Sequence, residues 1–123
     1  MRIPLLVMLA IPIAAQAQGL QAVRPLPGYA CAMLNVSPAV LRDGPLPPVL
    51  AEPRAGAVEI GQASAVVIVA SPAKTAAGYT AVLHLDGRPG WVESSKLKPY
   101  RSASNPNATC TPSLMSDGRP GFR

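Results

Sequence analysis

The stretch Asp86-Gly87-Arg88-Pro89-Gly90-Trp91-Val92-Glu93-Ser94-Ser95-Lys96-Leu97 carries the clearest structural signals in the chain. Its Asp-Gly pair tolerates the positive φ of a tight β-hairpin, so it joins a strand over residues 79–85 to one beginning at Trp91. Side chains alternate along a strand, so Val92 is expected to face the interior and Trp91 the opposite side. Gly90 permits close backbone approach at this bend. The stretch therefore predicts an antiparallel hairpin followed by a single 3₁₀ turn over residues 94–97.

Further strand signals lie on both sides of this hairpin. The strongest is the run Ala-Val-Val-Ile-Val-Ala at residues 65–70. Other candidates are residues 48–50, 57–60 and 98–100. Pro99 restricts the last of these to a sheet edge or a strand start, because proline donates no backbone hydrogen bond. No helix longer than a turn fits between residues 51 and 100, so we expect an all-β fold, a small five-stranded antiparallel barrel over residues 46–100.

The composition is typical of one small domain with irregular flanks. The 123 residues include 15 Pro and 10 Gly, and only 4% are aromatic. This argues against a long helical bundle and against several domains. Residues 18–45 are rich in proline and are expected to be extended. Residues 101–123 are expected to form a polar tail beyond whatever Cys110 fixes.

The segments over residues 46–100 together resemble a bacterial SH3-like (SH3b) domain. The resemblance rests on residues 49–53, 60–62, 65–69 and 78–82 and on the terminal Gly90-Trp91-Val92 that is followed by Leu97. It implies a barrel in which residues 51–62 and 71–78 are loops. It also implies a non-catalytic binding module that contacts peptidoglycan or an envelope protein.

Residues 1–17 have the pattern of a secretory signal peptide. Arg2 precedes an apolar stretch over residues 3–14, and Ala15-Gln16-Ala17 suits a signal peptidase. A membrane anchor is the alternative, but a span needs about 20 apolar residues and this run is shorter. No later segment is long and apolar enough, so no stable membrane span is expected. We expect a periplasmic or secreted protein, and export argues against a nucleic-acid partner despite the net charge of +5.

Cys31 and Cys110 are the only cysteines, and they are expected to form one intramolecular disulfide. A redox pair and half of a metal site are the alternatives. The chain has no Cys-x-x-Cys motif, and His84 is its only histidine. No metal and no cofactor is expected.

The candidate ligand-binding residues are Trp91, Tyr79, Arg88 and Lys96. A partly exposed ring stacks on sugars and peptides at little entropic cost, and the two cations lie near Trp91 in sequence. The alternatives are rings that only pack against the barrel and a solvated basic face. Proline-peptide recognition of the eukaryotic SH3 kind is not expected, because Glu93 and Lys96 replace the proline and tyrosine of that groove.

Catalysis has little support in the sequence. The one candidate base, His84, lies on a predicted strand with Asp86 two residues on, and no nucleophile, metal or phosphate-binding motif accompanies the pair. We therefore expect a non-enzymatic, monomeric binding module of the envelope. The alternative is a structural or assembly accessory whose proline-rich extension binds another protein.

Overall fold

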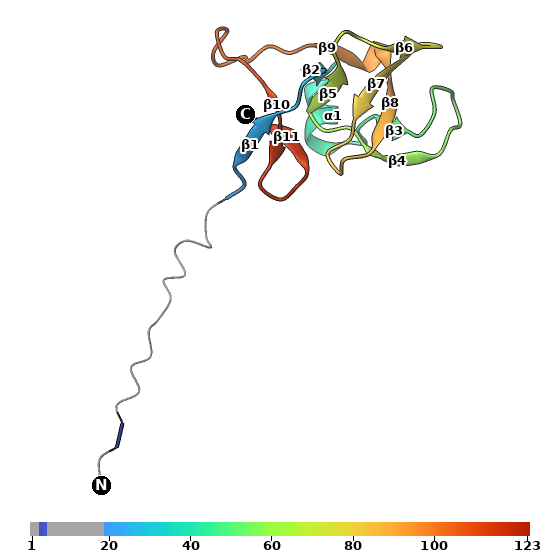
Figure 1. Cartoon of the computed structure of the whole chain (residues 1–123). Helices are drawn as coiled ribbons and strands as arrows, with labels where there is room; N and C mark the ends of the chain where they lie inside the picture. The colour runs from blue at the N-terminus through green and yellow to red at the C-terminus, as the bar shows by residue number, and fades with distance from the viewer. Residues whose placement is uncertain (1–2, 5–18) are drawn as a thin grey trace.

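The computed structural model describes residues 3–4 and 19–123, and its chain is mostly antiparallel β-structure (Figure 1). Apart from residues 3 and 4, the predicted signal peptide lies outside the described residues. The elements are β1 (Ala22–Pro25), β2 (Tyr29–Leu34), α1 (Pro38–Asp43), β3 (Pro48–Leu50), β4 (Glu59–Gln62), β5 (Val66–Ala70), β6 (Thr75–Ala76), β7 (Tyr79–Leu83), β8 (Pro89–Glu93), the 3₁₀ turn η2 (Ser94–Lys96), β9 (Leu97–Pro99), β10 (Pro112–Met115) and β11 (Pro120–Phe122). Within the described ranges, no helix is long and apolar enough to cross a membrane.

The main sheet has eight strands in the order β4-β3-β8-β7-β5-β2-β9, with β6 paired to β7. The predicted hairpin is present: β7 and β8 pair from Tyr79 opposite Glu93 to Leu83 opposite Pro89. Gly87 in its turn has φ +94°, which favours glycine. The strand over residues 66–70, the 3₁₀ turn and the edge position of Pro99 in β9 also agree with the predictions.

One face of this sheet forms the hydrophobic core. The buried residues of this core come from segments far apart in the sheet order, so the sheet must curve to bring their side chains into contact. They are Leu34, Val49, Ala63, Val67, Val82 and Val92. Gly90 lies against this cluster, because a Cβ on it would lie 2.5 Å from Val49 Cγ1. The close approach predicted for this glycine is therefore present.

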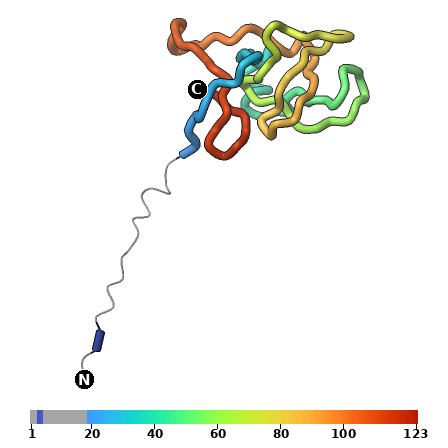
Figure 2. The backbone as a smooth tube through the Cα atoms, in the orientation of Figure 1, coloured from blue at the N-terminus to red at the C-terminus, as the bar shows by residue number. Residues whose placement is uncertain are grey.

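A second sheet, in the order β1-β10-β11, lies beside the main sheet (Figures 1 and 2). The predicted disulfide joins β2 to the segment before β10: Cys31 and Cys110 are bonded across a sequence separation of 79. Cys31 is opposite Ile68 in the main sheet, and Ile68 is fully buried on the face away from the core cluster. The disulfide therefore fixes the small sheet to the face of the main sheet that points away from the core cluster.

The expected five-stranded barrel needs correction. The main sheet has more than five strands and its hydrogen bonding does not close. Part of the reason is β2, which comes from the segment expected to be only extended and inserts between β5 and β9. The same segment contains α1, because the Ser37 hydroxyl caps the Val40 amide and Pro38 suits the first helical turn.

The expected polar tail over residues 101–123 also needs correction, because β10 and β11 lie within it. β10 pairs with both β1 and β11, and Ser113 is fully buried. Local polarity suggested a tail, whereas pairing with a strand near the other end of the chain orders the segment.

Candidate functional site

The outer face of the main sheet gathers three of the five aromatic residues in the chain. Trp91 is opposite Ala81 on β7 and Leu50 on β3, and Tyr79 is opposite Glu93. Directly opposed residues project to the same face, and Val92 already faces the core, so Trp91 and Tyr79 point outward together. We call Tyr29, Tyr79 and Trp91, with the side chains between them, the aromatic face.

Two grooves lie on the aromatic face. The larger, about 220 Å³, has Tyr29 and Trp91 among its walls, Ala70 and Ala81 between them, and Lys74 beside them. The smaller, about 100 Å³, is lined by Pro47, Pro48, Leu50, Tyr79, Glu93 and Lys96. Each groove therefore combines an aromatic ring that can stack, an apolar surface and one lysine. The smaller groove also contains the Glu93 carboxylate, so Lys74 in the larger groove is the cation better suited to a negative group.

The structure places three of the four predicted ligand-binding residues on this face. Tyr79 and Lys96 share the smaller groove, and half-buried Trp91 lines the larger one. Arg88 does not join them. Its guanidinium lies 2.6 Å from an Asp86 carboxylate oxygen and donates to the Ile60 carbonyl at 2.7 Å.

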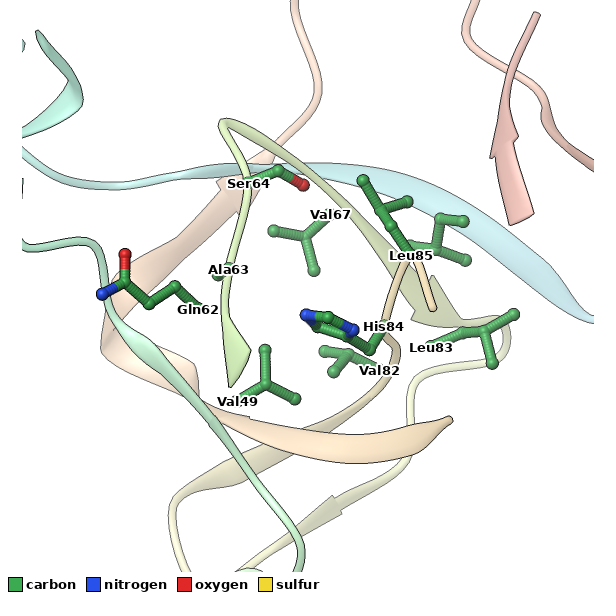
Figure 3. A pocket seen from close by; sticks show the side chains of 10 residues that line it. Val49, Gln62, Ala63, Ser64, Val67, Val82, Leu83, His84 and Leu85 are labelled. Atoms are coloured by element: carbon green, nitrogen blue, oxygen red, sulfur yellow. The ribbon is translucent and has the colours of Figure 1, made fainter. Parts of the chain in front are cut away.

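A different cavity, of about 210 Å³, surrounds His84 (Figure 3). The imidazole projects into a space bordered by Val49, Val67 and Val82. The ring lies over Gly61, where a Cβ would be 2.5 Å from Nε2. Ser64 also lines the cavity, but its hydroxyl donates to the Val66 carbonyl at 2.7 Å and is not bonded to His84. Among the residues that line this cavity, the imidazole is therefore oriented but is not paired with a nucleophile.

Asp86 links His84 to Arg88. One carboxylate oxygen lies 2.9 Å from His84 Nδ1 and the other lies 2.6 Å from the Arg88 guanidinium. The side-chain hydrogen bond from Arg88 and then the Arg88 backbone N–H hold the pKa of Asp86 well below the ordinary value. They outweigh the opposing effect of desolvation, and His84 lowers the pKa by a smaller amount. Asp86 is therefore an anion at neutral pH and holds the Arg88 guanidinium and the His84 imidazole in place.

This cluster gives a prediction on acid stability. A carboxyl whose pKa is lowered on folding stabilises the fold above its unfolded pKa of about 4, and the stabilisation is lost as pH falls toward the folded value. Wild-type protein should lose thermal stability between pH 5 and pH 2.5 more steeply than Asp86→Asn. The measurement is the melting temperature against pH, followed by circular dichroism.

Asp117→Asn is the control for this measurement. Asp117 accepts from the Arg119 amide as Asp86 accepts from the Arg88 amide, but within the described residues it forms no ion pair. The variant therefore removes a turn carboxylate that has no ion pair in that part of the chain. The asparagine oxygen can still accept from the Arg119 amide, so its pH slope should stay close to that of wild type. Equal pH slopes in wild type and Asp86→Asn would contradict the prediction.

The sequence predictions missed Tyr29 and Lys74, which strand β2 and the loop after β5 bring to the larger groove.

The sequence predictions also missed a repeat. Asp-Gly-Arg-Pro-Gly followed by an aromatic residue occurs at residues 86–91 and again at 117–122. Both copies form hairpins with the same backbone hydrogen bonds: His84 donates to Arg88 and Met115 donates to Arg119. The two turns lie side by side, because Pro120 is within 4.0 Å of a Cβ built on Gly87 (Figure 2).

No family model, curated protein or solved structure matches this chain.

Proposed function

We propose that this chain is an exported, non-catalytic binding module of the bacterial envelope, that residues 46–100 with β2 form an SH3-like domain built on a curved, open sheet, and that the aromatic face binds peptidoglycan. The β7–β8 hairpin, the 3₁₀ turn η2 and the buried Gly90 support the SH3-like assignment. The predicted signal peptide and the disulfide fit an oxidising compartment outside the cytoplasm.

The observation that carries this proposal is the gathering of Tyr29, Tyr79 and Trp91 on one sheet face. Large rings normally dominate the core of a small domain, yet every member of the core cluster is aliphatic. The rings instead border two shallow grooves, each with a lysine. Flat rings beside the small Ala70 and Ala81 side chains leave room for a sugar or an extended peptide, and Lys74 suits a carboxylate of the wall polymer.

Co-sedimentation with purified peptidoglycan at low salt tests this proposal. Wild-type protein, expressed without residues 1–17, should appear in the pellet. Trp91→Ala should weaken binding about tenfold, because the stacking contribution of one ring is about 1 kcal/mol and the lost groove wall adds to it.

Arg54→Ala is the matched control. Arg54 is exposed, pairs with Glu52 in the loop between β3 and β4, and lines neither groove. This variant should bind as wild type does. Wild-type protein that stays wholly in the supernatant would contradict the proposal.

A second candidate is an assembly accessory that binds another protein through residues 18–45. Four of the six exposed large apolar residues among the described ones belong to this segment: Leu20, Val23, Tyr29 and Leu41. Leu20 and Val23 expose 63% and 62% of their surface. A partner that co-purifies from envelope extracts with wild type and Trp91→Ala, but not with Val23→Ser, would favour this candidate.

A further inference from the structure

His84 is held in one orientation by a chain of contacts. Two groups of Asp86 compete for Nδ1: the amide N–H could donate to it at 3.3 Å, and a carboxylate oxygen lies 2.9 Å from it. The carboxylate is closer and ionised and can only accept, so we assign the proton to Nδ1. Arg88 fixes Asp86, and the bond from Arg88 to the Ile60 carbonyl ties the arrangement to β4. The lone pair of the imidazole is therefore on Nε2.

Nε2 has no hydrogen-bond partner in the part of the chain that the structure describes. Among the described residues, no donor lies within hydrogen-bonding distance of it. The described part of the chain contains no fully buried, unpartnered side-chain nitrogen or oxygen, so Nε2 retains access to the cavity or to solvent. The His84 side chain as a whole is only 19% exposed. His84 Nε2 is thus an available hydrogen-bond acceptor in largely apolar surroundings.

The repeat shows that the hairpin does not require this histidine. Met115 occupies the corresponding place, two residues before the aspartate, and donates the same backbone hydrogen bond at 2.8 Å as His84 does at 2.9 Å. The Met115 copy forms no ion pair between Asp117 and Arg119 within the described residues. The ion-paired arrangement therefore accompanies the imidazole and is not a consequence of the hairpin sequence.

The geometry points to the cavity around His84 as a binding site for a small apolar molecule or group that carries a neutral hydroxyl, such as a phenol. Seven of its ten lining residues are aliphatic: Val49, Ala63, Val67, Ile68, Val82, Leu83 and Leu85. Its volume of about 210 Å³ exceeds the 150 Å³ or so in which an apolar cavity binds benzene. A ring would fill the apolar space, and its hydroxyl would donate to Nε2.

Phenol and fluorobenzene are the probes, because they share a shape and only phenol has a donor. In a ¹H–¹⁵N NMR titration of the disulfide-bonded protein, phenol should shift the amides of Ala63, Val67 and His84 in a saturable way. It should bind about fivefold more tightly than fluorobenzene, the ratio that one net hydrogen bond supplies.

His84→Met copies the residue that the second hairpin already carries, so the hairpin should still form. It should reverse the preference, because fluorobenzene is the more apolar probe. Ser64→Ala, which changes the cavity wall but not Nε2, should keep the wild-type ratio. If His84→Met fails to fold, Asp86→Asn provides the second variant: its neutral amide holds the Nδ1 proton less firmly than the carboxylate does, so it should reduce the ratio. No saturable shift at these amides, or an unchanged ratio in the folded His84 or Asp86 variant, would overturn the proposal.

Discussion

Replacing both Cys31 and Cys110 with serine should lower the free energy of unfolding by about 4 kcal/mol. The disulfide closes a loop spanning a sequence separation of 79, and the chain-entropy relation assigns a loop of that size roughly 4.5 kcal/mol. The core it supports is small and consists of Leu, Val and Ala side chains. A loss of this size is a large fraction of the stability of such a domain.

Urea unfolding at 25 °C, followed by Trp91 fluorescence, measures this loss. Wild-type protein treated with a reductant is the control, because it breaks the bond without adding a serine hydroxyl. Both samples should show a similar loss, and amide hydrogen exchange should rise first in β1, β10 and β11, which the disulfide fixes to the main sheet. A loss below about 1 kcal/mol in both would show that the small sheet packs without the disulfide.

The sequence predicted those parts of the fold whose signals are local. The Asp86-Gly87 turn, the run over residues 66–70 and the edge position of Pro99 each follow from neighbouring residues. The role of β2 in the main sheet, and the pairing of β1 with β10, were missed because they join segments far apart in the chain. Hydrophobic alternation alone does not identify such partners.

The same distinction applies to the candidate site. Strand alternation was enough to place the Trp91 and Val92 side chains on opposite faces of the sheet. Tyr29 reaches the aromatic face only through the pairing of β2 with β5. Arg88 was assigned to the ligand site because it is near Trp91 in sequence. Its guanidinium is instead bound to Asp86 and to the Ile60 carbonyl, and the second partner is remote in the chain.

Gly90→Ala should destabilise the protein by about 2–3 kcal/mol. The added Cβ would lie 2.5 Å from Val49 Cγ1 and 3.0 Å from both Ile60 Cδ1 and the Leu50 carbonyl oxygen. Val49 is buried in the core and the Leu50 carbonyl belongs to the backbone of β3, so neither can move without displacing the sheet. Overpacking of a close-packed core typically costs 1–3 kcal/mol.

Gly121→Ala is the matched variant, because Gly121 occupies the corresponding position in the second Asp-Gly-Arg-Pro-Gly copy. The three atoms nearest its added Cβ all belong to Met115: Cγ is the closest, Sδ would lie 2.8 Å away and Cε 3.5 Å away. This unbranched side chain can rotate aside, unlike the buried Val49 and the β3 backbone. Both changes restrict the unfolded chain equally, which favours folding by about 0.4–1 kcal/mol. Gly121→Ala should therefore be near neutral in urea unfolding. The difference between the two variants isolates the collision with β3, and equal stabilities would mean that β3 does not pack on Gly90 as the structure has it.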